Sequence, residues 1–271
     1  MRLHIISWNL LADCYIRGIS KLFPGDPPSY LLWEERFERI KEQIQNTQAD
    51  IFCLQEVDHY QDGIEPFLES IGYDSIYLQR PRKPDGCLIA FDASKFSVDG
   101  RCEIQLDDLA DSQYICDQLY MKQNVCLLLH FRFISTNFKF IVACCHIHWN
   151  PNLEDLKNNQ VRYILSKIHS AVSSSTSDDS TIPIIFCGDF NSFPSTHMYE
   201  LITQPFDNSI EKPLRNTDNY SAKEVKFLCE PSLSRLCRWM RVLGLDVAMD
   251  SWDGDTATKE GLKSPIHMMM H

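Results

Sequence analysis

The sequence predicts an α/β fold with mixed sheets, and two observations support that prediction. Short apolar runs typical of strands alternate with amphipathic segments typical of helices. Two of the apolar runs, residues 125–133 and 138–145, are long and are joined by turn residues, which indicates an antiparallel hairpin. Because hairpins and helical crossovers occur together, we expect a sandwich of mixed sheets rather than a single parallel sheet.

The stretch TIPIIFCGDFNS places polar side chains at the end of an apolar run. Residues 182–186 predict a strand buried on both faces, and Gly188 then favours a turn. Asp189 and Asn191 follow two positions apart, so in extended backbone both side chains would project to the same side. Open α/β sheets carry their sites at such strand ends. The alternative is an ordinary surface turn, because Gly, Asp and Asn are common turn residues.

Three more predicted strands end in a polar residue. The run 3–8 ends at Asn9, the run 50–55 leads into Glu56, and the run 138–145 ends at His146. A glutamate is a hard oxygen ligand that suits magnesium or manganese. His148 completes an H-x-H pair with His146, which alone is a weak metal signal. Structural roles remain open: a strand-end cap for Asn9 and a surface carboxylate for Glu56.

Periodicity and turn residues assign the other segments. Helices are predicted at 33–47, 63–70, 152–170 and 196–203, and strands at 73–78, 87–91 and 96–104. Irregular structure is expected at 12–30, which contains three prolines, and at 107–118. Asp85 and Gly86 favour a hairpin turn. The basic residues Arg80, Arg82 and Lys83 around Pro81 favour a solvated loop, and contact with phosphate is the alternative.

Composition is that of a globular protein, with 44% hydrophobic and 23% charged residues. The 11 cysteines are odd in number and several lie in apolar runs, so we expect buried thiols in a reducing compartment. The sequence shows no signal peptide and no long apolar run, which predicts a soluble cytoplasmic or nuclear protein that does not enter a membrane.

The chain is acidic, with a formal net charge of −11. This charge disfavours broad binding to a phosphate backbone, which needs a basic surface. An acidic protein still acts on phosphates when a divalent metal ion offsets the repulsion.

Four segments in order, SWNLLAD, CLQEVD, CCHIHWNP and CGDFNSFPS, resemble the endonuclease/exonuclease/phosphatase superfamily. The W-x-x-R and I-x-x-Q-I patterns of the first predicted helix resemble its deadenylase branch, which includes the carbon catabolite repressor, nocturnin and angel types. The likeness covers residues 1–206. It implies a four-layered α/β sandwich of the DNase I-like kind.

The resemblance also implies a magnesium-dependent (or manganese-dependent) 3′–5′ exoribonuclease that acts on poly(A) 3′ ends of RNA. Each motif position then takes a role from the family. Glu56 matches the principal metal ligand, and Asn9 matches an amide that supports metal and phosphate. Asp189 matches the carboxylate that orients or deprotonates the attacking water, and His146 matches a histidine on the phosphate side. Asn191 matches an amide that contacts phosphate or base, and Pro151 matches a proline that packs against adenine.

The C-terminal part departs from the family pattern. The expected late Asp and the Ser-Asp-His segment are not found there, and the last strands of one sheet are predicted to be missing. Residues 225–250 predict strand, helix and strand, and resemble the start of the PIN-like RNase domain of Mut-seven-type exonucleases. We therefore expect a domain at 1–206, a linker at 207–224, a small α/β fragment at 225–250 and a tail at 251–271, as in a longer fusion or a truncated form of one.

Two other functions remain open at this point. The same fold carries abasic-site endonucleases and phosphatases that act on inositol lipids or small molecules, and fold alone does not choose among them. The missing terminal histidine also fits a non-catalytic module that binds RNA or protein. Loss of one transition-state donor typically costs about 10²–10³ in rate, so weak activity would survive it.

Overall fold

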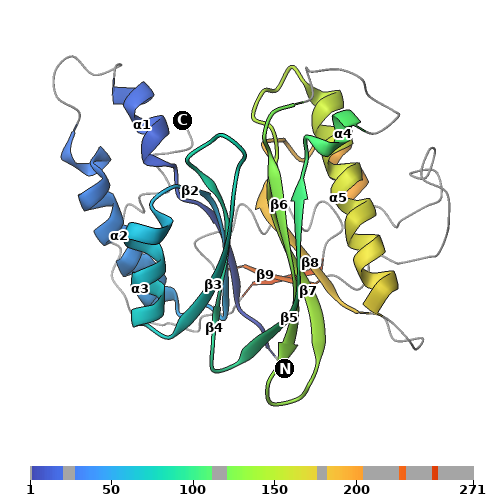
Figure 1. The fold of residues 1–271 in the computed structure, drawn as a ribbon, viewed down its shortest axis with the longest axis horizontal. Helices are drawn as coiled ribbons and strands as arrows, with labels where there is room; N and C mark the ends of the chain where they lie inside the picture. Colours follow the sequence, from blue (N-terminus) through green and yellow to red (C-terminus); the bar gives the residue numbers. More distant parts are fainter. Residues whose placement is uncertain are drawn as a thin grey trace.

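The computed structural model describes residues 2–20, 28–111, 121–175, 182–203, 226–229 and 246–249. Two four-stranded sheets pack face to face, and helices cover the outer face of each, as Figure 1 shows. The layers are therefore helix, sheet, sheet and helix. This arrangement confirms the predicted four-layered α/β sandwich.

The first sheet has the strand order β1-β2-β4-β3 and carries α2 and α3 on its outer face. Strands β1 and β2 are parallel, and the other neighbours are antiparallel. Buried Ile40 and Ile44 of α2 and Leu68 of α3 pack against this face. The elements are β1 Ile5–Asn9, α1 Asp13–Ser20, a 3₁₀ turn Ser29–Leu31, α2 Trp33–Thr47, β2 Ile51–Val57, a π-helical turn Tyr60–Ile64, α3 Glu65–Ser70, β3 Tyr73–Gln79 and β4 Gly86–Asp92.

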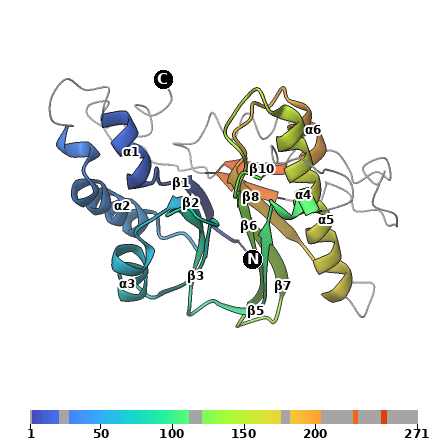
Figure 2. The same ribbon diagram turned by 45° about the horizontal axis from the view of Figure 1, so that its top comes forward.

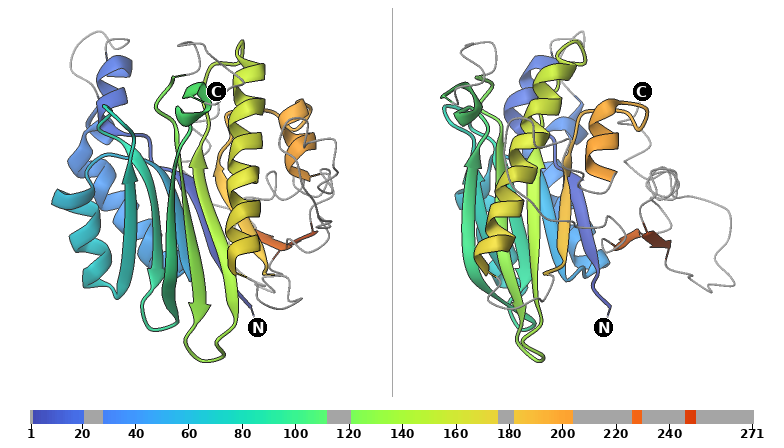
Figure 3. Two further views of the ribbon diagram at one scale, coloured as in Figure 1. Left: turned by 45° about the vertical axis from the view of Figure 1, so that its right-hand side comes forward. Right: turned by 90° about the vertical axis from the view of Figure 1, so that its right-hand side faces the viewer.

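The second sheet has the order β5-β6-β7-β8, and α5 and α6 lie on its outer face (Figure 2 and Figure 3). Strands β7 and β8 are parallel, whereas β5, β6 and β7 form the antiparallel meander that the hairpin prediction requires. The elements are β5 Phe96–Gln105, α4 Asp108–Asp111, β6 Val125–Phe133, β7 Lys139–His146, α5 Glu154–Ser175, β8 Ile184–Asp189 and α6 His197–Thr203.

The inner faces of the two sheets form one apolar core rich in phenylalanine and cysteine. Eight cysteines within residues 2–203 of the described ranges are free, and six of these eight are buried. The expectation of buried thiols is confirmed for these residues. None of the helices that the structure describes combines the length and apolar composition needed to cross a bilayer.

Several local predictions are wrong. Both segments expected to be irregular contain a helix, because α1 lies within 12–30 and the short α4 lies within 107–118. Gly86 is the first residue of β4 rather than part of a turn, and Asp85 before it is fully buried. Strand β8 continues past Gly188 to Asp189, and its first two residues are only partly buried because it is an edge strand in the described part of the sheet.

Two short strands lie in the C-terminal part of the chain. β9 Lys226–Cys229 and β10 Asp246–Met249 pair in parallel, as the strand predictions for 225–250 require. The helix predicted between them lies outside the described residues. The domain boundaries and the missing last strands of the sandwich stay predictions.

Gly188 is a position where only glycine fits. Its φ is 152°, and a Cβ there would lie 2.3 Å from the carbonyl oxygen of Cys145. We expect Gly188→Ala to lower the free energy of unfolding by about 2 kcal/mol or more, because backbone of β7 must shift to admit the methyl group. Urea denaturation measures the change.

Gly63→Ala is the matched control, because a Cβ at Gly63 meets only side-chain atoms at 3.5 Å or more. Its stability should change by less than about 1 kcal/mol. Equal effects of the two substitutions would contradict the close approach of β8 to β7.

Candidate active site

The polar strand ends that the sequence singles out meet at one edge of the sandwich. In the parallel pair β1 and β2, Asn9 lies beside Gln55, the residue before Glu56. In the parallel pair β7 and β8, His146 lies beside Asp189. Because the sheets pack face to face, the ends of both pairs come together, which places Asn9, Glu56, His146 and Asp189 in one cluster.

The side-chain amide of Asn9 joins the two carboxylates of this cluster. Its Nδ2 donates to Glu56 Oε1 at 3.0 Å and to Asp189 Oδ2 at 2.8 Å. Its Oδ1 accepts from the backbone N–H of Leu11 at 2.9 Å, which fixes the amide orientation. A single residue of β1 thus connects an acid of the first sheet to an acid of the second.

Glu56 is held in an uncommon backbone conformation. Its φ is 54°, and the register between β2 and β4 shifts between Leu54 and Val57, which marks a β-bulge. A bulge turns a side chain that would otherwise alternate away from the site. The second oxygen, Oε2, accepts from the backbone N–H of Ala12 at 3.1 Å. Strain of this kind occurs where surrounding contacts hold a side chain for function.

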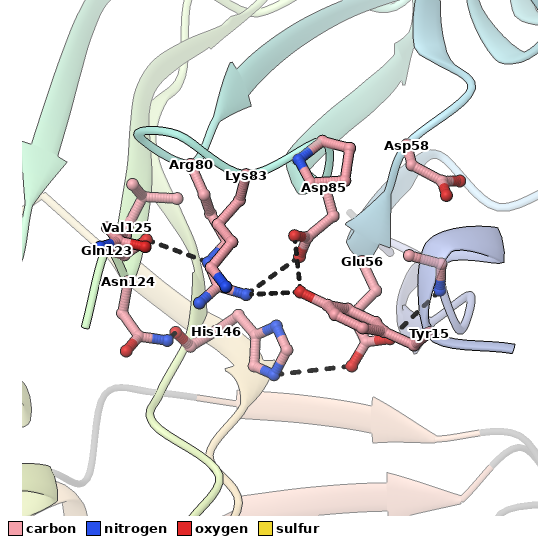
Figure 4. Close-up of polar contacts among 12 residues, drawn as sticks. Tyr15, Glu56, Asp58, Arg80, Lys83, Asp85, Gln123, Asn124, Val125 and His146 are labelled. Atoms are coloured by element: carbon pink, nitrogen blue, oxygen red, sulfur yellow. Dashed lines mark hydrogen bonds and ion pairs between the residues drawn. The ribbon is translucent and has the colours of Figure 1, made fainter. Parts of the chain in front are cut away.

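His146 faces both carboxylates. Its Nε2 lies 3.8 Å from Glu56 Oε1 and 3.9 Å from Asp189 Oδ2, which Figure 4 shows for Glu56. Its other ring nitrogen, Nδ1, is buried and has no hydrogen-bond partner within the described residues. A ring in this position presents an N–H toward the acids or toward a group that lies between them.

Asn191 lies beside the cluster but does not project with Asp189. Its φ is 45°, so the extended alternation expected for these two residues stops at Asp189. Its backbone N–H donates to Asp189 Oδ1 at 2.9 Å, and its Nδ2 donates to the carbonyl oxygen of Ile147 at 3.0 Å. Pro151 is exposed in the turn between β7 and α5. No described contact joins Pro151 to the cluster, and its role stays a prediction.

The donor set fits a hard divalent cation. Glu56 and Asp189 offer carboxylate oxygens, the ligands that Mg²⁺ prefers, whereas Asn9 turns its Nδ2 toward them and its Oδ1 accepts from Leu11. Mg²⁺ usually takes only one or two protein carboxylates and keeps water or substrate oxygens. In the described part of the chain, no group of three or more His, Cys, Asp or Glu side chains is arranged to hold a metal ion. The H-x-H pair stays a weak metal signal, and Glu56 and Asp189, joined by the Asn9 amide, are the residues that would hold Mg²⁺.

A buried ion pair between Arg80 and Asp85 lies next to the cluster of Asn9, Glu56, His146 and Asp189. Arg80 Nη1 donates to Asp85 Oδ2 at 3.1 Å and to the hydroxyl oxygen of Tyr15 at 3.1 Å, and Tyr15 donates to Asp85 Oδ1 at 2.8 Å (Figure 4). Arg80 Nε also donates to the carbonyl oxygen of Gln123 at 3.0 Å. Burial and the bond to Asp85 raise the pKa of Tyr15, so its hydroxyl stays protonated. This group ties α1, the β3–β4 connection and the start of β6 together.

A second set of buried amides supports β7. Asn124 Nδ2 donates to the carbonyl oxygen of His146 at 2.8 Å, and Gln160 Nε2 donates to Asn124 Oδ1 at 3.2 Å. Gln160 Oε1 accepts from the backbone N–H of His148 at 3.0 Å. The helix α5 therefore fixes the backbone on both sides of Ile147. Burying amides is favourable only where such bonds are made.

The two flanks of the cluster differ in electrostatic character. Burial, Asp58, Asp85, Glu56 and Asp13 raise the pKa of Cys14 to about 11, which indicates an acidic flank near α1. Burial, Lys122, Arg80, Lys157 and His146 lower the pKa of His148 to about 4, which indicates a basic flank near β7. Such a site attracts a cation on one side and an anion on the other.

Sequence reasoning missed most of these supporting residues. Arg80 was assigned to a solvated loop, yet it is 9% exposed. The chain also contains an Asp58-His59 dipeptide, although it lies directly after β2 and not in the C-terminal part where the family pair was sought. Asp58 accepts from the backbone N–H of Cys14 at 3.1 Å, and His59 stacks on Trp33. Only tertiary contacts reveal these roles.

Comparison with known proteins agrees with this architecture. Residues 6–222 match the model of the Endonuclease/Exonuclease/phosphatase family. The chain belongs to this family.

Curated relatives include a carbon catabolite repressor protein 4 homolog of Arabidopsis thaliana (homolog 4), 30% identical over 86% of this chain and 66% of that protein. The human protein angel homolog 2 is 34% identical over 74% of this chain and 36% of that protein. The chain thus spans between about a third and two thirds of these relatives.

Two solved structures are similar to this chain in fold. A crystal structure of ANGEL2, described as a 2′,3′-cyclic phosphatase in complex with adenosine-2′,3′-vanadate, matches with a TM-score of 0.65 and 35% identity, over 74% of this chain and 57% of that chain. The human Nocturnin catalytic domain with a bound sulfate anion matches with a TM-score of 0.60 and 26% identity, over 73% of this chain and 67% of that chain.

Removing Arg80 should destabilise the fold strongly. Arg80→Met leaves the Asp85 carboxylate buried without its cation, and we expect a loss of about 3–5 kcal/mol in the free energy of unfolding. Adding Asp85→Asn to the same chain should recover part of that loss, because it removes the unpaired charge. Denaturant titration of the single and double variants measures both.

The exposed pair of Arg132 and Asp99 is the control for this comparison. Arg132→Met should have only a small effect on the free energy of unfolding, as is usual for surface ion pairs. A loss of that small size for Arg80→Met, or no recovery in the double variant, would contradict the role of the buried pair.

Stability should fall in acid partly because of His148. Its pKa is lowered from the usual 6.5 to about 4, so between these values the unfolded chain binds a proton that the folded chain does not. The free energy of unfolding therefore decreases as the pH falls from 6.5 to 4, by about 2 kcal/mol from this residue.

His148→Gln lacks the titrating group and should show a shallower decrease over the same range. Urea titrations at several pH values measure the slope. Identical slopes for the two proteins would contradict the buried, neutral state of His148.

Proposed function

We propose that this chain is a magnesium-dependent hydrolase of phosphodiester bonds in RNA, and that it acts as a 3′–5′ exoribonuclease of the deadenylase type. One observation carries the proposal: a single amide, Asn9 Nδ2, holds Glu56 and Asp189 together while His146 Nε2 faces both. Two curated relatives, from Candida glabrata and Saccharomyces cerevisiae, are named 3′–5′-exoribonuclease subunits of the CCR4-Not complex, which supports the choice of reaction.

The residues of the cluster divide the work of hydrolysis between them. Asp189 receives the Asn9 amide on one carboxylate oxygen and the Asn191 N–H on the other, so the carboxylate is oriented without a positive partner. An oriented carboxylate accepts a proton from an attacking water molecule or holds that molecule in line. His146 presents its Nε2–H to the same space, where it would donate to a phosphate oxygen.

The remaining tasks of hydrolysis would fall to a metal ion. Bound Mg²⁺ supplies charge neutralisation and activation of water. Glu56 and Asn9 are the residues that would hold it, and Asp189 lies close enough to take part. Binding of RNA, and of poly(A) 3′ ends in particular, belongs to this proposal, as do the roles of Asn191 and Pro151 toward the base.

A second candidate is opening of a 2′,3′-cyclic phosphate at an RNA end. The specific observation that favours it is the likeness to ANGEL2, whose structure is described as that of a 2′,3′-cyclic phosphatase. The same residues would serve, because a cyclic phosphate is also a phosphodiester. The two candidates differ in substrate and not in the groups that perform the reaction.

The test uses a 5′-labelled RNA with a 3′ tail of adenylates. In Mg²⁺ the chain should shorten the tail stepwise, and EDTA should stop the reaction. Glu56→Ala should lower the rate by at least about a hundredfold, because the principal ligand is lost. A parallel substrate that ends in a 2′,3′-cyclic phosphate separates the second candidate from the first.

The control is Glu69→Ala, an exposed glutamate of α3, which should keep the full rate. Cleavage that persists in EDTA, or that survives Glu56→Ala in a folded chain, would contradict the proposal.

A further inference from the structure

Lys157 is a buried ammonium group without a counter-ion among the described residues. It lies in the first turns of α5 and is 3% exposed. Its Nζ donates to the carbonyl oxygen of Asn191 at 3.1 Å, and no described carboxylate forms an ion pair with it. A buried charge is costly unless an opposite charge or further hydrogen bonds join it. An ammonium has three donors, so two of those on Lys157 are left for another acceptor.

The surroundings of Lys157 are positive. The charged groups that lower the pKa of the neighbouring His148 are Lys122, Arg80, Lys157 and His146, and all of them are cationic or become so on protonation. Arg80 is already paired with Asp85 at 3.1 Å, so Lys122 and Lys157 are the lysines of this flank for which no ion pair is described, in a chain with a net charge of −11. An anion would be stabilised there.

The contacts of Lys157 place this anion beside the cluster. Lys157 reaches the carbonyl oxygen of Asn191, whose N–H donates to Asp189. Gln160, one helical turn further on the same face of α5, holds the backbone of His148. On the other side, Arg80 Nη2 donates to the carbonyl oxygen of Lys122 at 3.2 Å and so fixes the chain that carries Lys122. The basic flank is therefore built on rigid, hydrogen-bonded elements.

We propose that Lys157, together with Lys122 of the same flank, binds a second phosphate of the substrate, next to the phosphate that is hydrolysed. This inference rests on the proposed function, and it deepens that function by naming a substrate with two phosphate groups in succession. The chemistry is that of a phosphate oxygen accepting from an ammonium. The second phosphate is either an internal one of an RNA strand or a terminal one, and the substrates below distinguish them.

The first experiment measures binding without turnover. Fluorescein-labelled decaadenylate is titrated with the full chain in Ca²⁺ at several concentrations of KCl. Lys157→Gln keeps a donor toward Asn191 but lacks the charge. We expect it to weaken binding about tenfold and to reduce the slope of log Kd against log salt concentration by about 0.7, the change for one lost contact to a single-strand phosphate. Lys157→Arg should keep the slope.

Lys167→Gln is the matched control. Lys167 lies on the same helix about 15 Å further along and contacts the ring of Tyr163. Its removal should leave both affinity and slope unchanged. A merely structural role of Lys157 would change stability or affinity but would not change the salt slope.

The second experiment compares turnover of three substrates in Mg²⁺: ApA, ApApA, and ApA with a 3′-phosphate. We expect the wild-type chain to favour a two-phosphate substrate over ApA by at least about tenfold in kcat/KM, and Lys157→Gln to lose that preference. A preference for ApApA identifies an internal phosphate, and one for the 3′-phosphorylated dinucleotide identifies a terminal phosphate.

Outcomes that overturn the inference are distinct from failure of the proposed function. Absence of hydrolysis of all three substrates contradicts the proposed function, whereas the salt slope is still measured without turnover. An unchanged slope in a folded Lys157→Gln chain overturns the inference. If that variant does not fold, equal kcat/KM of the wild-type chain for all three substrates overturns it instead.

Discussion

The arrangement of this site depends on one constraint: two carboxylates that repel each other must stay within reach of one amide. Glu56 belongs to the first sheet and Asp189 to the second, and Asn9 Nδ2 donates to both. The amide carries only a partial charge, so it orients the acids without neutralising them. A divalent cation bound by both acids would relieve the remaining repulsion, which is why the proposed function assigns Mg²⁺ to this position.

Holding the acids in place requires rigid strand ends, and the buried polar residues of the molecule provide this rigidity. In the described ranges they gather around the site instead of being scattered through the core. They are Arg36, Gln55, Arg80, Asp85, Asn124, His146, His148, Lys157 and Gln160. Arg36, for example, donates to the carbonyl oxygen of Leu10 at 2.7 Å and so fixes the chain between β1 and α1. The desolvation of these groups is offset only while their bonds are intact.

The division into an acidic and a basic flank follows from the same framework. The residues of α1 and the end of β2 contribute carboxylates, whereas α5 and the segment before β6 contribute the cations Lys157 and Lys122. The β3–β4 connection contributes Arg80 together with its partner Asp85. A chain with a strong negative charge overall can therefore attract both a metal ion and a phosphate at neighbouring positions. Net charge describes solubility and association in general, but the local distribution decides what a site binds.

Much of the fold could be predicted from the sequence because it depends on local periodicity. The helix Trp33–Thr47 and the β6–β7 hairpin are confirmed, and the polar strand ends at Asn9, Glu56, His146 and Asp189 do meet. The errors arise where tertiary contacts override local preference. Asp85 has the sequence of a turn residue but is buried by Arg80, and the backbone of Asn191 leaves the extended region.

Long-range contacts also explain why the basic flank was not predicted. Lys157 is a charged residue at a position that shares its helix face with Val161, Ile164 and Ile168, and nothing near it in the chain reveals that its Nζ donates to the carbonyl oxygen of Asn191. The family relationship predicts the fold and the chemistry of the site. It does not predict which buried side chains hydrogen-bond to the strand ends. Those roles follow from distances and burial alone.

Binding of Mg²⁺ to the folded chain tests the central claim most directly. A ligand that binds only the folded state raises the melting temperature in a saturable manner. We expect Mg²⁺ and Mn²⁺ to raise the melting temperature of the wild-type chain, and the shift to vanish in Glu56→Gln, which keeps the shape of the side chain but lacks its charge. Absence of a shift in the wild-type chain, or an equal shift in the variant, would contradict a metal site at the joined strand ends.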